Sequence, residues 1–300
     1  MRILLASTSS LALPTFELLR STNHQTLGLL TKTEKPAGRG RQTKDSSLVD
    51  QIANSMPIYR INDDASLERL LFELKPDLVI AISFGMLVKK AALDMPKHGW
   101  INLHFSLLPK YRGAAPVQRA ILAGEHKSGV TVFFLDEGMD TGPIYAAKEM
   151  SIEHLNAGEA LNAMANLGAN AVLETLSAIE NGVPPINQIG HPSSARKISK
   201  EETKIAFDSD SEDIGRQIRA LSPLPGAWCT FRGTRFKILK SESRPESIGK
   251  PGEIFSINPL LVATDRGAIS ILEIQESGKR VMSGEEWARG ARPVLGETFE

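Results

Sequence analysis

The sequence predicts an α/β domain with a mostly parallel sheet, joined by a linker to a small β-barrel domain. In residues 1–182, short and nearly continuous apolar runs alternate with stretches of helical spacing, which is typical of parallel strands covered on both faces. Residues 183–204 are rich in Pro, Ser and charge and have no clear periodicity, which is typical of a linker. In residues 205–300, several short β-like runs are separated by turn residues, as in small barrels.

The elements expected in the first domain follow from the spacing of apolar residues. Buried strands are expected at 2–6, 26–31, 77–83, 100–106 and 129–136. Helices are expected at 12–21, 114–124 and 158–181. Strands that alternate with helices build a largely parallel sheet, whose sites lie at the carboxyl ends of the strands.

The second domain is expected to begin with a helix at 209–221. Ser209 and Glu212 have the three-residue spacing of a capping box, which predicts the start of this helix. The β-like runs that follow lie at 227–239, 252–257, 260–264 and 268–273. They predict the strands of the barrel.

Charge and cysteine content limit the kinds of function. Because 35 basic residues balance 35 acidic ones, no overall positive field attracts nucleic acid, and an RNA partner would need a local basic patch. The opening "MRILLAS" is too short for a signal peptide and no later run has membrane-spanning length, so we expect a cytoplasmic protein with no membrane partner.

The single cysteine, Cys229, excludes an internal disulfide and a cysteine-based zinc cluster. We expect it to be a small packing residue.

Three polar residues are the candidates for chemistry. Asn102 and His104 lie two residues apart near the end of the run 100–106, so their side chains share one face of a strand. Asp140 lies in "DEGMDTGPI", whose two glycines predict a tight loop. An Asp beside His104 could orient the imidazole and stabilise a positive charge on it, and Asn102 could donate to an oxygen that gains negative charge. The set contains no strong nucleophile and therefore suits direct acyl transfer, in which the substrate itself attacks.

The residues alone leave other interpretations open. His104 could be a satisfied core side chain, and Asp140 a turn former. One His, one Asp and one Asn make a poor transition-metal site. Ser106 lacks the partners of a nucleophile elbow, and "GRGRQ" lacks the three-glycine spacing of a dinucleotide fingerprint.

Five quoted stretches resemble one known family. The stretches are "INLHFSLLPKYRGAAP", "DEGMDTGPI", "TKTEKPAGRGR", "KISKEETKIAFD" and "IRALSPLPGAW". They are similar, in the same order over nearly the whole chain, to the formyltransferases that use 10-formyltetrahydrofolate, above all to members that act on charged initiator tRNA. The resemblance implies a Rossmann-like N-terminal domain of residues 1–182 and an OB-like, tRNA-binding barrel of residues 205–300.

The resemblance also implies roles for individual residues. Asn102, His104 and Asp140 match the catalytic trio of the family, and no metal is implied. The folate-binding turn of the family matches Ser106, Leu107, Leu108 and Pro109. The implied reaction transfers a formyl group from 10-formyltetrahydrofolate to the α-amine of methionine on initiator tRNA, for translation initiation, by a protein expected to be a monomer.

Two departures from the family pattern lie near this site. Phe105 stands where the family usually has Gly, and the large ring could narrow or restack the folate pocket. Ser7 stands at a glycine position in the turn after the first strand, which puts the geometry of that turn in question.

The loop 31–44 carries five basic residues and one acidic residue. Composition alone is typical of a solvated surface loop. The resemblance implies instead that it enters the acceptor arm of tRNA, with Arg39 between two glycines as the main contact and Lys35 and Arg41 beside it. Basic residues of the linker, Arg196, Lys197, Lys200 and Lys204, are further candidates.

Three alternative functions share most of these features. A formyltransferase for a nucleotide sugar or purine precursor would share the trio but would not need the basic loop. A tRNA-binding protein without catalysis would not need His104 and Asp140 together. A folate hydrolase, in which water replaces the amine, would look much the same and is separated only by assay.

Overall fold

The computed structural model describes residues 1–33, 47–246 and 248–300. The chain divides into two compact units, which are described separately. The first comprises Met1–Gly113, Ser128–Met150 and Leu161–Ala195, and the second comprises Ala114–Lys127, Ser151–Ala160 and Arg196–Glu300.

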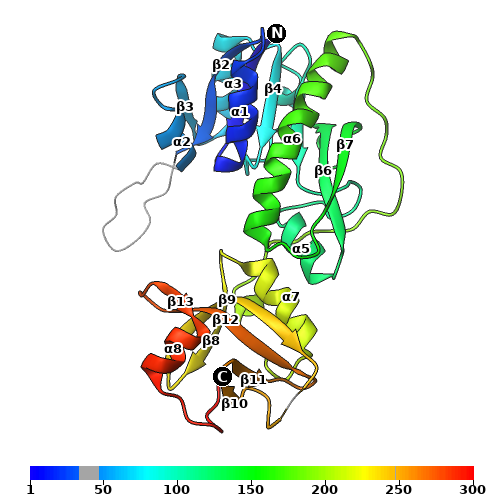
Figure 1. Ribbon diagram of the computed structural model, residues 1–300. Coiled ribbons are helices and arrows are strands. Elements are labelled where there is room, and N and C mark those ends of the chain that lie inside the picture. Colours follow the sequence, from blue (N-terminus) through cyan, green and yellow to red (C-terminus); the bar gives the residue numbers. More distant parts are fainter. Residues whose placement is uncertain (34–46, 247) are drawn as a thin grey trace. The chain divides into compact units, whose positions relative to one another are not determined.

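A sheet in the order β3-β2-β1-β4-β5-β6-β7 forms the centre of the first unit (Figure 1). Its strands are β1 (Arg2–Ser7), β2 (Gln25–Lys32), β3 (Ile58–Ile61), β4 (Leu78–Ile82), β5 (Trp100–His104), β6 (Lys127–Phe134) and β7 (Ile144–Ser151). The pairings from β3 to β5 are parallel, and β6 is antiparallel to β5. The predicted mostly parallel sheet is therefore confirmed. The strand order reverses at β1, which is the mark of a doubly wound fold.

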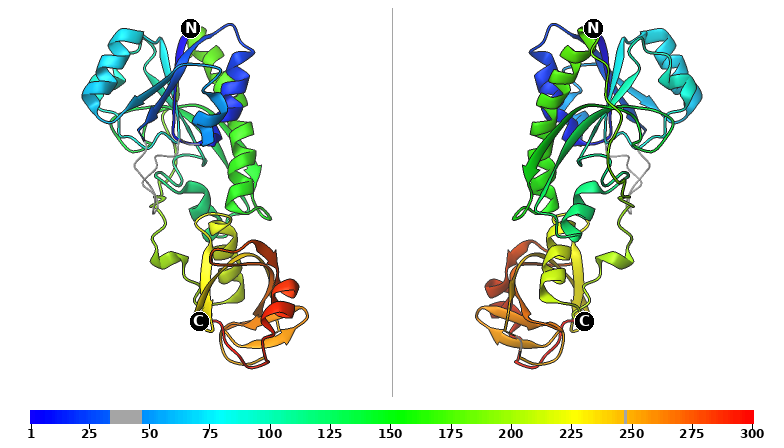
Figure 2. Two further views of the ribbon diagram at one scale, coloured as in Figure 1. Left: turned by 90° about the vertical axis from the view of Figure 1, so that its left-hand side faces the viewer. Right: turned by 90° about the vertical axis from the view of Figure 1, so that its right-hand side faces the viewer.

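Helices cover both faces of this sheet (Figure 2). They are α1 (Leu13–Arg20, after the short turn η1, Ser10–Ala12), α2 (Ser47–Ile52), α3 (Asp64–Leu74), α4 (Lys90–Leu93) and α6 (Ala157–Glu180). The helices α1 and α6 lie on one face and α3 on the other. The core on the α3 side combines Leu67 and Leu71 of α3 with Leu4, Val79 and other apolar residues of the sheet. The helix α3 begins at a capping box between Asp63 and Ser66.

The alternation of β5 determines where its polar residues point. Trp100 is fully buried and its indole donates to the carbonyl of Ala92 in α4. Leu103 faces the opposite way and lies against Gly168 of α6. A Cβ added to this glycine would lie only 2.6 Å from a methyl carbon of Leu103. Since side chains alternate along a strand, Asn102 and His104 share the face of Trp100, away from α6.

The turn after β1 accommodates Ser7 without a glycine. Ser7 is the fully buried last residue of β1. Its Oγ accepts from the amide of Ser9 at 3.0 Å and donates to the carbonyl of Ser9 at 3.1 Å. The serine side chain thus stabilises the turn that the missing glycine had put in question.

The second unit is built on an antiparallel sheet in the order β10-β11-β12-β9-β8, with β13 paired to β12. Its strands are β8 (Ala227–Phe231), β9 (Thr234–Arg244), β10 (Ile254–Ile257), β11 (Leu260–Ala263), β12 (Ala268–Glu276) and β13 (Val281–Ser283). Its helical elements are α5 (Pro116–Leu122), η2 (Glu201–Thr203), α7 (Ser211–Leu221) and α8 (Gly284–Ala291). The last residues bridge both edge strands, with Phe299 opposite Phe231 of β8 and Thr298 opposite Glu253, next to β10. They close the sheet in the manner of a barrel.

The predicted start of α7 is wrong by one residue. Asp210, not Ser209, caps the helix, and its carboxylate accepts from the amide of Glu212. Asp210 is held there by a β-bridge and a 3.0 Å ion pair with Arg266, while the amide of Ser209 bonds in a turn to the carbonyl of Ala206. Both residue types cap helices well, so this long-range contact decides between them.

Cys229 is fully buried in the core of the second unit, as predicted. Burial raises the pKa of its thiol to about 12. In the described part of the chain, none of the helices has both the length and the apolar character needed to cross a membrane.

Candidate active site

The imidazole of His104 lies at the carboxyl end of β5 between two oxygen atoms. Its Nε2 lies 2.9 Å from the main-chain oxygen of Tyr111, and its Nδ1 lies 3.6 Å from Oδ2 of Asp140. The ring is nearly buried, and the edge of Phe133 packs against it with 6.4 Å between ring centroids. The strand end therefore presents an imidazole whose two nitrogen atoms have different neighbours.

The oxygen of Tyr111 determines which nitrogen carries the proton in the neutral ring. A carbonyl oxygen only accepts hydrogen bonds, so Nε2–H must be the donor of the 2.9 Å bond. Nδ1 is then the nitrogen that gains and loses a proton. It is also the nitrogen that faces the carboxylate of Asp140.

The carboxylate oxygen of Asp140 that faces His104 is also held by a backbone amide. This oxygen, Oδ2, accepts from the amide of Gly113 at 2.7 Å. Asp140 has a left-handed backbone, with φ of +54°, which Asp tolerates better than most residues. The loop needs glycine at 142, where an added Cβ would lie 1.7 Å from the carbonyl oxygen of Phe134. The tight glycine loop predicted around Asp140 is therefore present.

Asn102 is half-buried on the same face of β5 as His104. Within the described residues its carboxamide has no protein hydrogen-bond partner. An amide group that the protein leaves unused can donate to a substrate oxygen.

The turn Ser106–Pro109 follows directly and is pinned at two points. The buried Ser106 donates through Oγ to the carbonyl of Lys110 at 2.7 Å. Thr131 of β6 donates to the carbonyl of Ser106 at 2.7 Å and accepts from the amide of Leu108 at 3.1 Å. Leu108 and Pro109 are buried, whereas Leu107 is half-buried. Phe105, the departure from the family pattern, is 5% exposed.

Four residues of this site have no local sequence signal. Tyr111 supplies the carbonyl to His104, and Thr131 pins the turn. Gln188 and Ser193 come from the stretch expected to be a linker and hydrogen-bond to the loops that surround the imidazole. Their roles depend on contacts 7 to 82 residues apart in the sequence, none of which a local pattern reveals.

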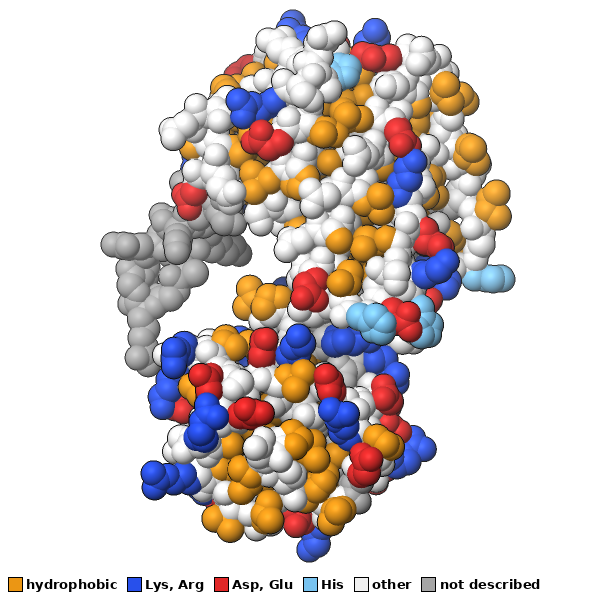
Figure 3. Space-filling view, viewed as in Figure 1, with side chains coloured by type: hydrophobic (Ala, Val, Ile, Leu, Met, Phe, Trp, Pro, Cys, Tyr) orange, Lys and Arg blue, Asp and Glu red, His pale blue; other side chains and the backbone are white. Residues whose placement is uncertain are grey.

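Lys35, Arg39 and Arg41, the residues expected to contact tRNA, lie outside the described residues. The second unit has a basic and aromatic cluster on its own surface. The guanidinium carbon of Arg235 lies 3.9 Å from the ring centroid of Trp228, and Nζ of Lys204 lies 5.9 Å from it. Elsewhere on the visible face of this unit, basic and acidic side chains are interspersed (Figure 3).

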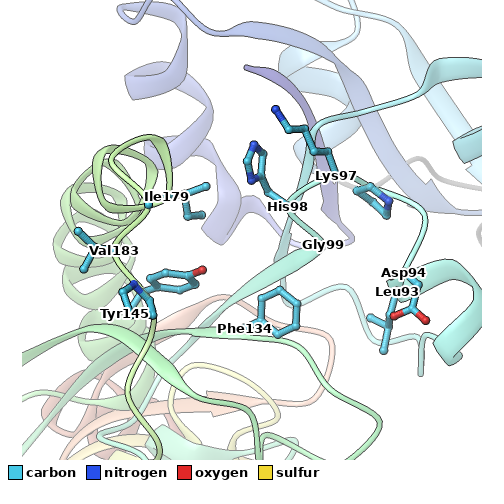
Figure 4. A pocket seen from close by; sticks show the side chains of 12 residues that line it. Leu93, Asp94, Lys97, His98, Gly99, Phe134, Tyr145, Ile179 and Val183 are labelled. Carbon is cyan, nitrogen blue, oxygen red and sulfur yellow. The ribbon is translucent and has the colours of Figure 1, made fainter.

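A pocket of the first unit lies at the end of β5 opposite to His104 (Figure 4). It has a volume of about 450 Å³, and Gly99, Phe134 and Tyr145 are among its lining residues. Burial raises the pKa of the Tyr145 phenol. None of the candidate catalytic residues lines this pocket. Gly99 precedes β5, whereas His104 is the last residue of β5.

Among the described residues, no cluster of three or more His, Cys, Asp or Glu could hold a metal ion.

Comparisons with known proteins agree over the whole chain. The model of the family "Formyl transferase" matches residues 1–176, and that of "Formyl transferase, C-terminal domain" matches residues 197–292. A methionyl-tRNA formyltransferase of Arthrobacter sp. (strain FB24) is 36% identical over 306 residues, covering 100% of both chains. One from Thermus thermophilus is 38% identical over 297 residues, covering 97% of this chain and 96% of its own.

Solved structures share the fold at lower identity. A crystal structure of HypX from Aquifex aeolicus in complex with tetrahydrofolic acid matches with a TM-score of 0.72 and 20% identity. The match covers 99% of this chain and 48% of that one. It supports the fold described above.

Proposed function

This chain belongs to the formyl transferase family, and on that premise we propose that it transfers a formyl group from 10-formyltetrahydrofolate to the α-amine of methionine on charged initiator tRNA. The observation that carries the proposal is the arrangement at the end of β5. Two acceptors hold His104, and the Asn102 amide beside it on the same face is unused. The full-length relatives of similar sequence are named methionyl-tRNA formyltransferases, which supports the choice of substrate.

The site can stabilise the charges that this transfer creates. As the amine attacks, a C–N bond forms at the formyl carbon and the formyl oxygen gains negative charge. The amide of Asn102 donates to this oxygen. The positive charge of His104, which is protonated at Nδ1 next to Asp140, also stabilises the oxygen. The C–N bond to the folate then breaks.

Proton transfer completes the balance of the reaction. The amine loses one proton, and the folate nitrogen gains one. Because Nε2–H is held by Tyr111, we assign both transfers to Nδ1 of His104: the charged ring gives its Nδ1 proton to the folate nitrogen and then receives the proton that the amine loses, with Asp140 stabilising the charged ring. No metal is required by these steps.

The turn Ser106–Pro109 is proposed to hold the folate. Its backbone is fixed by Thr131 before any ligand binds, which lowers the entropic cost of binding. The half-buried side chain of Leu107 offers an apolar surface within this turn.

We assign catalysis to residues 1–182, a linker to 183–204, and tRNA binding to 205–300 together with Lys35, Arg39 and Arg41. The first part of the linker, up to Ala195, packs with the catalytic unit and supplies Gln188 and Ser193 to it. The cluster of Trp228, Arg235 and Lys204 supports an RNA contact in the second unit, because cations stacked on an aromatic ring suit both phosphates and exposed bases. A cytoplasmic location goes with this assignment, since the proposed substrate is used in translation.

One experiment tests the proposal. The protein is incubated with 10-formyltetrahydrofolate and charged initiator tRNA, and formyl-methionine is measured after hydrolysis of the ester. Formyl-methionine that depends on both substrates supports the proposal. Loss of formyl groups without tRNA would indicate a folate hydrolase, and transfer only to an amino sugar nucleotide would indicate a small-substrate enzyme.

A further inference from the structure

The side chain of Gln188 makes four hydrogen bonds next to the active site. Its Oε1 accepts from Nη2 of Arg112 at 2.6 Å and from Nε at 3.2 Å. Its Nε2 donates to the carbonyls of Asp140 at 2.9 Å and Gly142 at 2.8 Å. A guanidinium only donates and a carbonyl only accepts, so the orientation of the amide is fixed by its partners.

These bonds tie together the two loops that hold His104. One loop supplies the Tyr111 carbonyl and continues into Arg112, which Gln188 binds. The other supplies the carboxylate of Asp140, whose own carbonyl Gln188 also binds. Gln188 therefore connects the supports on the two sides of the imidazole.

Both supports have a backbone that needs external restraint. Tyr111 and Asp140 have φ of +61° and +54°, a left-handed conformation that residues with a Cβ rarely adopt. Such conformations persist where the surroundings hold them. Near Gln188, Ser193 accepts from the amide of Tyr111 at 2.8 Å through Oγ and from the amide of Arg112 at 2.8 Å through its carbonyl.

We propose that Gln188 is a positioning residue for the transfer reaction, an inference that rests on the proposed function. The hydrogen-bond partners of the Gln188 side chain are Arg112, Asp140 and Gly142, and His104 is not among them. It acts by fixing the spacing between the Tyr111 carbonyl and the Asp140 carboxylate. The imidazole then keeps its Nε2–H bonded to the Tyr111 carbonyl and its Nδ1 facing the Asp140 carboxylate. A displacement of about 1 Å in such supports can lower turnover about 100-fold.

The substitution Gln188→Glu tests this role with almost no change in shape. It keeps an acceptor for Arg112 but removes both donors to the carbonyls of Asp140 and Gly142. The matched control is Asn187→Asp, the same chemical change on the exposed neighbouring residue. We expect kcat of Gln188→Glu to fall about 10- to 100-fold, with KM for both substrates within about twofold of the control.

A second variant separates positioning from added charge. Gln188→Met removes all four hydrogen bonds and adds no charge, and we expect a similar loss of kcat. The second measurement is ¹⁵N NMR of the His104 imidazole, which distinguishes a ring protonated at Nε2 from one that exchanges between tautomers. The wild type should show a proton fixed at Nε2, and both Gln188 variants should show averaging.

The outcomes are distinct. Turnover of both Gln188 variants within twofold of Asn187→Asp, or a loss of turnover with unchanged His104 signals, would overturn the proposal. Failure of both variants to fold would assign Gln188 a purely structural role and overturn it too. If wild type and Asn187→Asp both fail to formylate tRNA, the proposed function is wrong, while the NMR comparison still decides whether Gln188 positions His104.

Discussion

Nε2 of His104 lies 2.9 Å from the main-chain oxygen of Tyr111, a residue seven positions further along the chain with a left-handed backbone. This bond makes Nδ1 the exchanging nitrogen and turns it toward Asp140. The imidazole is thus oriented by a backbone carbonyl, which cannot change its own protonation near neutral pH. Substitution of the Tyr111 side chain leaves that carbonyl in place, so the function of the bond depends on the loop conformation.

Replacing either catalytic group is expected to lower turnover far more than binding. His104→Ala removes the proton-transfer group, and Asn102→Ala removes the free amide donor. Loss of one oxyanion donor typically costs about 100- to 1000-fold in rate. Steady-state kinetics should therefore show a reduced kcat with KM for tRNA and folate nearly unchanged.

The control for this pair is His98→Ala, a histidine of the pocket at the other end of β5. It should retain wild-type kcat. If Asn102→Ala or His104→Ala turns over at a rate near that of His98→Ala, the role given to that residue is wrong.

The sequence predicts part of this site on physical grounds alone. The two-residue spacing of Asn102 and His104 at the end of an apolar run predicts a shared face, and β5 has it. The proximity of Asp140 to His104 rests on the resemblance, because a loop 36 residues further along carries no local signal of its destination. Gln188 was not predictable, since its partners are 46 to 76 residues away and its own surroundings look like linker.

Phe105 is expected to affect stability first and folate second. Its side chain is 5% exposed, so Phe105→Ala should lower the free energy of unfolding by about 3–5 kcal/mol. Phe72→Ala is the matched control, because Phe72 is 69% exposed and its loss should change stability by no more than about 0.5 kcal/mol. Denaturant unfolding measures both.

The milder Phe105→Leu tests the folate pocket in a folded protein. Leu keeps most of the apolar side chain and leaves a smaller cavity than Ala, so this change should destabilise the fold less than Phe105→Ala. We expect an altered affinity for 10-formyltetrahydrofolate and an unchanged KM for tRNA. Identical folate titrations of Phe105→Leu and wild type would show that the ring only fills the core.

Cys229 is expected to be chemically inert in the native protein. Burial raises the pKa of its thiol to about 12, so hardly any thiolate exists near pH 8. A disulfide reagent should react with one thiol after unfolding and with none before. Rapid labelling of the native protein would contradict the buried position.

The same thiol should make the fold less stable in alkali. The unfolded thiol ionises near pH 9 and the folded one near 12, so in this window the unfolded state binds fewer protons and stability falls as pH rises. From pH 8 to pH 10, wild type should lose about 1–2 kcal/mol more than Cys229→Ala. Parallel unfolding curves of the two proteins over this range would contradict the shift.

At the level of the fold, the sequence predicts long apolar runs well and short mixed ones poorly. The strands β1, β2, β4, β5 and β6 and the helix α6 lie close to where periodicity puts them. The strand β7 was missed because its exposure alternates without a strong apolar face, as in "IYAAKEMS". The helix α8 was missed because its few apolar residues become informative only beside the core around Trp287.

Glu202 is expected to contribute stability that is lost in acid. A hydrogen bond from Arg119, with a second from the amide of Ser199, lowers its pKa to about 2. A lowered folded pKa stabilises the fold above the unfolded value of 4.5, and this stability disappears as pH falls toward 2. Because the side chain is 40% exposed, solvent screening limits the contribution to about 1 kcal/mol.

The measurement compares Glu202→Gln with wild type at pH 7 and at pH 2.5. The difference in unfolding free energy should be present at pH 7 and largely gone at pH 2.5. Glu73→Gln, at an exposed carboxylate of α3, serves as the control and should show little difference at either pH. A pH-independent effect of Glu202→Gln would mean that its charge is unimportant.

Contacts to tRNA are expected to be electrostatic and separable from the chemistry. Arg39 belongs to the most concentrated basic stretch of a neutral chain, and Arg235 stacks on Trp228 in the second unit. Each Arg→Ala change should raise KM for charged tRNA, leave kcat and folate affinity unchanged, and reduce the salt slope of tRNA binding by about one. Arg244→Ala is the matched control, since Arg244 lies at the far end of the same strand as Arg235 and pairs with Glu242.

Formylation is measured for wild type and the three variants at two salt concentrations. If Arg39→Ala formylates tRNA like the control at both, the basic loop is a solvated insertion, and a small-molecule acceptor becomes the better candidate. If only Arg235→Ala behaves like the control, RNA recognition lies in the loop and not on the Trp228 cluster.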